Sequence, residues 1–372
     1  MARVHGLGKR AAPAYACNTK ITDSATSETY FVGPSIGSGG FAECYEIWKR
    51  GDSRNIMAGK FIEKKRLAQK ESMRKRVVQE MVVFKHLQHP NIVRMIHDFT
   101  TTTSVIILME LCSNGTLNDL LRRRRVITEE ETRYFTGHIV EGLKYLRDLN
   151  IIHRDIKPAN LFINAEMVVK IGDFGLAIYD NDKRGGTCGT PNYMAPELLE
   201  KKMYSFEADM WALGCTVYGL LVGKAPFDMG AVEKTSHKIR HCDYHLPEHL
   251  SDPAKHFIRS LLQRDPACRL RVHEVHDTEF FNVGIYPSSL LADCFLQPPV
   301  FDTSIATKLP PEVIADDMGI LYQTGDFLYS GKFGNIYVMY GEEQALAGQI
   351  IDRRVICTNE GLQEQVRQFV VE

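Results

Sequence analysis

The chain has 372 residues, of which 44% are hydrophobic and 24% are charged. This composition is that of a globular protein and excludes collagen-like and low-complexity disordered chains. Lys and Arg number 45 against 46 Asp and Glu, so the formal net charge is −1. We therefore expect neither nucleic acid nor a membrane surface as a partner, because both would require a large excess of positive charge.

Nine cysteines are dispersed along the chain, and none forms a CxxC pair. This pattern is not a disulfide framework and indicates a reducing compartment. No apolar run approaches the ~20 residues that a membrane-spanning helix needs, and the first residues lack the apolar stretch of a secretory signal. We expect a protein of the cytoplasm, the nucleus or both.

In chain order, residues 1–29 show no hydrophobic periodicity and predict a loose N-terminal extension. Strand signals dominate residues 30–110, with one helical stretch between them, and helical patterning dominates residues 117–281. Thr128 followed by Glu131 predicts a capping box at one helix start. A strand-rich half followed by a helix-rich half predicts an α+β protein with two lobes.

The segment 36–44, IGSGGFAEC, lies between two strand-like runs. Its glycines would let backbone N–H groups approach a phosphate without a Cβ in the way. A plain Gly-rich hairpin is the alternative, because Ala42 takes the place of the last glycine of a GxGxxG pattern. The segment does not resemble a dinucleotide-binding turn, since no helix pattern starts after it.

Three further motifs occur in a fixed order: HRDIKPAN at 153–160, DFG at 173–175 and APE at 195–197. With them the sequence resembles the eukaryotic protein kinase family. The resemblance implies a kinase domain over residues 30–285. Its small lobe, an antiparallel β-sheet with helix C, would cover about 30–110, and its larger, mainly helical lobe about 113–285.

The resemblance also implies a chemistry, the transfer of phosphate from ATP with Mg²⁺ as cofactor. Lys60 would hold the α- and β-phosphates and be oriented by Glu80. Asp155 would orient the incoming hydroxyl and accept its proton, while Lys157 would neutralise charge on the transferred group. The two metal ligands would be Asn160 and Asp173.

Several stretches look specifically like the polo-like serine/threonine kinases, among them GSGGFAECYEI, LMELCSNGTL and GTCGTPNYMAPELL. The likeness implies Ser/Thr hydroxyls of proteins as substrates and Thr190 as a bridge between Asp155 and Lys157. It also suggests a role in the cell cycle and association with the centrosome. The nucleotide site would comprise Ile36, Gly37, Ser38, Gly39, Gly40, Phe41, Ala42, Glu43, Cys44, Ala58, Lys60, Met109, Glu110, Cys112 and Phe162.

One departure concerns activation. Gly186 stands where polo-like kinases carry the activating threonine, and Thr187 follows it. Thr187 is the best phosphosite candidate, since a phosphate there could pair with Arg154, and an upstream activating kinase would then be a partner. The alternative is an unmodified loop threonine.

The C-terminal part carries a second departure. Five prolines between 286 and 317 predict a linker. The remaining residues 318–372 are too few for a polo-box region, yet SGKFGNIY at 330–337 lines up with SGGFAECY at 38–45, and Gln349 with Lys60. We expect a partial second kinase-like small lobe here. A Gly-rich hairpin tail or a degenerate polo box is the alternative.

Two weaker signals are ambiguous. Histidines crowd the segment 237–256, but their spacing fits no standard zinc site. The arginines at 122–125 suggest a solvated helix end rather than a nuclear-localisation patch. For the whole chain, the alternative to an active kinase is a catalytically weak or inactive scaffold that keeps the fold.

Overall fold

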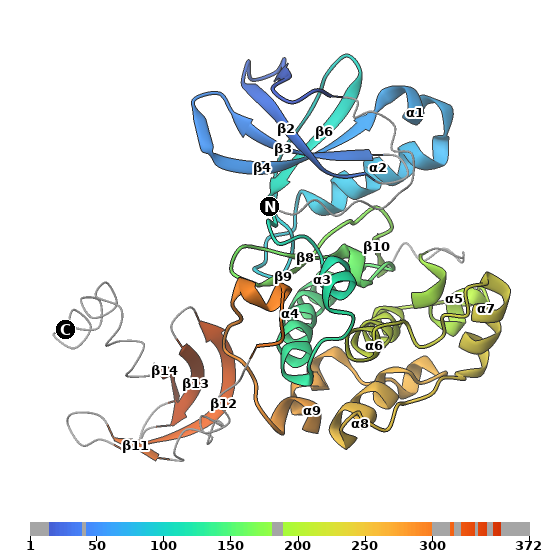
Figure 1. Cartoon of the computed structure of the whole chain (residues 1–372), viewed down its shortest axis with the longest axis vertical. Helices are drawn as coiled ribbons and strands as arrows, with labels where there is room; N and C mark the ends of the chain where they lie inside the picture. Colours follow the sequence, from blue (N-terminus) through green and yellow to red (C-terminus); the bar gives the residue numbers. More distant parts are fainter. Residues whose placement is uncertain are drawn as a thin grey trace.

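The computed structural model of the chain describes residues 15–38, 42–180 and 189–299, together with four strands between 313 and 350. Figure 1 shows two lobes, a β-sheet with helices above and a mainly helical part below. The expected α+β bilobal fold is confirmed.

The small lobe is a six-stranded antiparallel sheet in the order β1-β2-β3-β4-β6-β5. Helix α1 follows β4, and helix α2, which comes next, lies on the side of the sheet that faces the large lobe (Figure 1). The elements are β1 Lys20–Thr22, β2 Thr29–Ser38, β3 Ala42–Lys49, β4 Asp52–Glu63, α1 Lys64–Gln69, α2 Glu71–Phe84, β5 Met95–Thr100 and β6 Ser104–Glu110.

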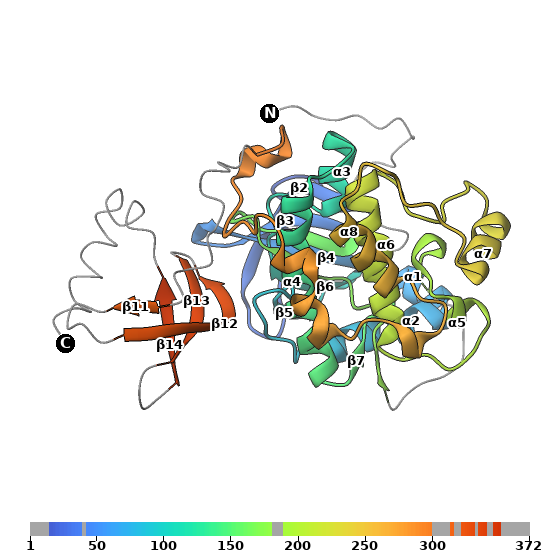
Figure 2. The same ribbon diagram turned by 90° about the horizontal axis from the view of Figure 1, so that it is seen from below.

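The large lobe is built around α4 and α6, and the view from below in Figure 2 shows α4, α6 and α8 close together. Its helices are α3 Leu117–Arg124, α4 Glu129–Asp148, α5 Pro196–Leu199, α6 Glu207–Val222, α7 Val232–His241, α8 Asp252–Leu261 and α9 Glu279–Asn282. Its short strands are β7 Ile151–Ile152, β8 Leu161–Ile163, β9 Val169–Ile171 and β10 Ile178–Tyr179.

Local sequence explains the boundaries of these helices. Thr128 accepts a hydrogen bond from the backbone of Glu131, whose side chain accepts one in return, so the expected capping box begins α4. Helix α6 is buried on nearly all sides and ends at Gly223, whose φ of 88° suits glycine. Arg269 donates to both oxygens of the Glu197 carboxylate at 2.7 and 2.8 Å, which ties the end of the large lobe to α5.

Two expected boundaries require correction. We expected a loose extension over residues 1–29, but from residue 15 onward the chain is packed on the sheet. Strand β1 pairs with β2, and the centroid of the Tyr15 ring lies 4.8 Å from that of Phe61. The linker expected over 286–317 also fails in part, since Leu290 and Phe295 are buried against the large lobe. In both segments apolar residues too sparse to give a periodicity are enough to dock the chain.

The four strands near the C-terminus form a separate sheet in the order β11-β12-β13-β14. It begins before residue 318, where we expected the tail to start. The strands are β11 Val313–Ala315, β12 Leu321–Gly331, β13 Gly334–Tyr340 and β14 Ala345–Ile350.

Candidate active site

Three elements converge at Lys60. Its ammonium, on β4, is 2.5 Å from Glu80 Oε1 of α2 and 3.3 Å from Asp173 Oδ1, which follows β9. Burial opposes the charged ammonium, but the two carboxylates outweigh burial and raise the pKa of Lys60. A lysine held charged in this way can bind phosphate oxygens.

Asp173 is held in an unusual backbone conformation, with φ of 62°. The next residue, Phe174, is fully buried and stacks on Phe84 of α2, and its ring lies 5.1 Å from that of His153. This packing fixes the aspartate while its carboxylate stays 41% exposed. Burial raises the pKa of that carboxyl, but the Lys60 ammonium outweighs burial and lowers it, so the group is an anion at neutral pH.

A second cluster surrounds Asp155. Lys157 Nζ lies 2.7 Å from Asp155 Oδ2, and the Thr190 hydroxyl donates to Asp155 Oδ1 at 2.9 Å. Lys157 Nζ also donates to Thr190 Oγ1 at 2.6 Å, so the threonine lies between the two charged groups. Asn160 Nδ2 donates to Asp155 Oδ2 at 2.9 Å and to its backbone oxygen. The structure thus brings all four predicted residues together.

Asp209 is a functional residue that the sequence motifs missed. It lies fully inside α6, and its two carboxylate oxygens accept hydrogen bonds from the backbone N–H groups of His153 and Arg154, both at 2.8 Å. These bonds hold the loop that carries Asp155. Sequence reasoning gave Asp209 no role, because it lies outside the motifs at 153–160, 173–175 and 195–197.

Gly189 also supports this loop. Its φ is 103°, and a Cβ there would meet the carbonyl oxygen of Arg154 at 2.8 Å. Only glycine fits this close approach, and it brings Thr190 to Asp155.

The described ends of the Gly-rich segment lie on the paired strands β2 and β3. Gly37 pairs with Cys44 and Ser38 with Glu43, and Ala42 is buried. Ile36 is exposed. Burial raises the pKa of the Cys44 thiol, so it is neutral at physiological pH. The predicted residues Gly39, Gly40 and Phe41 lie outside the described residues.

The remaining predicted nucleotide contacts lie where the lobes join. Ala58 of β4 pairs with Met109 of β6, and Glu110 ends that strand. Cys112 follows, and its pKa is raised to about 12 by burial and by the charge of Glu110. Phe162 lies on β8 of the large lobe. These residues come from both lobes, as a site between them requires.

The Glu110 side chain contacts both lobes at the segment that connects them. Its Oε1 forms an ion pair with Lys170 Nζ of β9 at 3.1 Å and accepts a hydrogen bond from the backbone N–H of Arg94 at 2.6 Å. Since Lys170 belongs to the large lobe and Arg94 to the small lobe, one carboxylate links the two.

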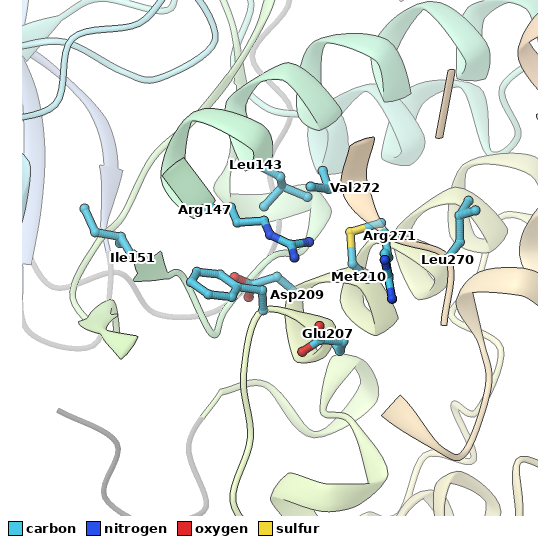
Figure 3. A pocket seen from close by; sticks show the side chains of 10 residues that line it. Leu143, Arg147, Ile151, Glu207, Asp209, Met210, Leu270, Arg271 and Val272 are labelled. Atoms are coloured by element: carbon cyan, nitrogen blue, oxygen red, sulfur yellow. The ribbon is translucent and has the colours of Figure 1, made fainter. Parts of the chain in front are cut away.

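A small cavity of about 10 Å³ lies between α4 and α6, where Asp209 holds the loop that carries Asp155 (Figure 3). Asp209, Leu143 and Arg147 are among the side chains that line it. Its size matches a single water molecule rather than a nucleotide. We therefore do not assign it as the nucleotide site.

None of the described helices combines the length and apolarity needed to cross a membrane. Across the part of the chain that the structure describes, no group of three or more His, Cys, Asp or Glu side chains is placed to hold a metal ion by itself.

Comparison with known proteins agrees with this geometry. Residues 30–281 match the family model described as Protein kinase domain. The chain is 44% identical over 283 residues to "Serine/threonine-protein kinase plk-1" of Caenorhabditis elegans, an alignment covering 76% of this chain and 43% of that protein. It is 40% identical over 283 residues to "Serine/threonine-protein kinase polo" of Drosophila melanogaster, covering 75% and 49%.

These alignments span less than half the length of the curated relatives. The family model, in contrast, covers more than half of this chain. Through residues 30–281, the chain belongs to the protein kinase domain family.

Proposed function

We propose that this chain is a protein serine/threonine kinase of polo-like type that uses ATP with Mg²⁺. The observation that carries the proposal is the presence of two charged clusters, Lys60 with Glu80 and Asp173, and Asp155 with Lys157 and Thr190. The first group suits a triphosphate and the second an alcohol that attacks it.

The donor set of this site suits Mg²⁺. Asp173 offers a half-exposed carboxylate, and Asn160 uses its Nδ2 for Asp155, which leaves its amide oxygen as the atom able to ligate a cation. Carboxylate and amide oxygens are hard ligands of the kind that Mg²⁺ takes together with substrate phosphates. When bound, the ion would neutralise phosphate charge during transfer.

The proton of the substrate hydroxyl would pass to Asp155. Its Oδ1 accepts from Thr190 and its Oδ2 from Asn160 and Lys157, so the carboxylate is fixed in orientation. In the proposed mechanism the incoming Ser or Thr hydroxyl takes a place beside this carboxylate, and Lys157 stabilises the charge that develops on the transferred phosphoryl group.

Regulation by phosphorylation is part of the proposal. Thr187 lies outside the described residues. A cavity of about 590 Å³ is lined by Arg74 and Arg76 of α2 and by Arg154. Three guanidinium groups would hold a phosphate on Thr187 by charge-assisted hydrogen bonds. An upstream kinase would then set the position of α2.

The biological setting rests on likeness alone. The polo-like relatives suggest a cell-cycle role in the cytoplasm or nucleus with centrosomal association, and protein substrates with Ser or Thr targets. The competing proposal is a kinase-fold scaffold with little or no activity. The complete set of catalytic side chains argues against it.

Transfer of radiolabelled phosphate from ATP to casein separates the two proposals. We expect Lys60→Met and Asp155→Asn each to lower the rate by about 10²–10⁴-fold. Lys49→Met is the matched control, because Lys49 is a surface lysine of the same sheet whose partner is Glu28. Equal transfer by the wild type and both active-site variants would favour the scaffold.

A further inference from the structure

The sheet β11–β14 repeats the sheet β1–β4 in strand order and in residue pairing. Both run antiparallel in chain order. When Tyr45 is aligned with Tyr337, five of the six pairs recorded between β12 and β13 have their counterparts between β2 and β3. The matching pairs are Phe31↔Trp48 with Gln323↔Tyr340, Val32↔Ile47 with Thr324↔Met339, Ser35↔Tyr45 with Phe327↔Tyr337, Gly37↔Cys44 with Tyr329↔Ile336, and Ser38↔Glu43 with Ser330↔Asn335.

The irregularities repeat as well. The β2–β3 ladder shifts register between Val32 and Ser35 and again between Ser35 and Gly37. The β12–β13 ladder shifts between Thr324 and Phe327 and between Phe327 and Tyr329, the equivalent positions. A bulge is a specific local feature of a strand pair, so two bulges at matching places argue against an unrelated hairpin.

The other two ladders agree. Cys44↔Lys60 corresponds to Ile336↔Gln349, and Ile21↔Tyr30 corresponds to Ile314↔Tyr322. Five buried apolar positions of the first sheet are apolar in the second. They are Ile21, Tyr30, Tyr45, Ile47 and Met57, matched by Ile314, Tyr322, Tyr337, Met339 and Leu346.

The two sheets differ at one edge. In the small lobe, β4 is paired along its outer side with β6, from Met57↔Glu110 to Glu63↔Ser104. In the second sheet, among the strands that the structure describes, β14 is the last strand and pairs only with β13. Among the described strands, the position taken by β6 in the first sheet therefore has no counterpart in the second.

We propose that residues 313–350 are a second copy of the β1–β4 sheet, and that β14 pairs with β14 of a second copy of this chain. The first sheet shows what such an edge accepts, namely an antiparallel apolar strand. A two-fold axis brings two identical strands together in that antiparallel direction.

The chemistry of β14 favours self-pairing. Its sequence, ALAGQI, contains no charged residue and no proline. Natural edge strands that avoid association carry Lys or other charged residues, or Pro. No like charges would oppose one another across the two-fold axis, and the chain's net charge of −1 gives little repulsion between copies.

The test uses the full chain in sedimentation velocity over a concentration series, with Ala347→Lys as the variant. Two lysines facing each other across the interface should weaken association by about tenfold or more. Ala315→Lys is the matched control, since it makes the same change on β11 at the opposite edge of the same sheet. We expect the control to dimerise like the wild type.

Hydrogen exchange of the wild type gives a second readout that does not depend on any variant folding. The amides of 345–350 should gain protection as concentration rises, while those of β11 should not. A chain that stays monomeric overturns the proposal. So does a dimer that survives Ala347→Lys, a dimer lost through Ala315→Lys alone, or β14 protection that does not change with concentration.

Discussion

Strands β1–β4 of the small-lobe sheet and the four strands β11–β14 have the same pairing order but different surroundings. In the first, Lys60 meets Glu80 from α2 and Asp173 from the loop after β9. In the second, the equivalent position is Gln349, and within the described residues no helix or further strand completes that sheet. The comparison shows that the strand pairing alone does not make an active site. The charged groups Glu80 and Asp173, which come from outside strands β1–β4, are also needed.

The largest expected effect comes from making the two sheets alike at this position. Lys60→Gln should lower the phosphate-transfer rate by about 10²–10³-fold, because one preorganised charge at the phosphates is lost. Steady-state kinetics with ATP and casein measure the effect.

The reciprocal change tests the comparison from the other side. Gln349→Lys in the Lys60→Gln background should restore nothing, since no counterpart of Glu80 or Asp173 is described near β14. Recovery of the rate in the double variant would show that the second sheet has a catalytic surrounding of its own.

The catalytic motifs could be located from the sequence because each is short and ordered along the chain. Asp155, Lys157 and Asn160 lie within six positions of one another, and the structure brings them together as expected.

Contacts between distant residues could not be predicted in this way. Arg124, expected at a solvated helix end, has a side chain only 3% exposed, pairs with Glu131 and donates to the carbonyl of Cys294, 170 residues away. Strand β1 has three residues, too few for a periodicity, and Asp209 acts through backbone groups far along the chain. Tertiary contacts, rather than local patterns, determine these features.

A core substitution gives the next largest effect. Ile47 is fully buried in the first sheet, and Ile47→Ala should lower the free energy of unfolding by about 2–5 kcal/mol. Met339→Ala, at the equivalent position, should cost less than half as much, because the described second sheet lacks counterparts of β5 and β6. Urea unfolding measures both, with the exposed Ile56→Ala as control. Equal losses at 47 and 339 would mean that the second sheet has a comparable core.

The pH dependence of stability tests the contact of His138 with β9, the strand that precedes Asp173. His138 Nδ1 accepts from the backbone N–H of Val169 on β9, and burial, partly offset by Glu141, lowers the pKa of His138 from 6.5 to about 4. The unfolded chain therefore binds more protons between these values. Stability should fall as pH drops from about 6.5 to about 4, by at most about 3 kcal/mol, and be fully present above pH 6.5.

His138→Gln should flatten this part of the pH dependence, measured as the free energy of unfolding at several pH values. The exposed His273→Gln is the control and should leave it unchanged. A slope that survives His138→Gln would assign the acid sensitivity to other groups.

The smallest effect concerns Tyr15, which packs on the first sheet from outside it. Its ring lies 4.8 Å from that of Phe61, and its hydroxyl lies 3.0 Å from Ser104 Oγ of β6. Tyr15→Phe keeps the ring and removes the hydroxyl contact, so the free energy of unfolding should fall by about 0.5–1.5 kcal/mol. The Ser104→Ala variant should cost a similar amount, and the double variant no more than either single change if the two groups act only on each other. Full additivity of the two losses would mean that the Tyr15 hydroxyl stabilises the protein through a partner other than Ser104, such as Thr103 Oγ1 at 3.2 Å.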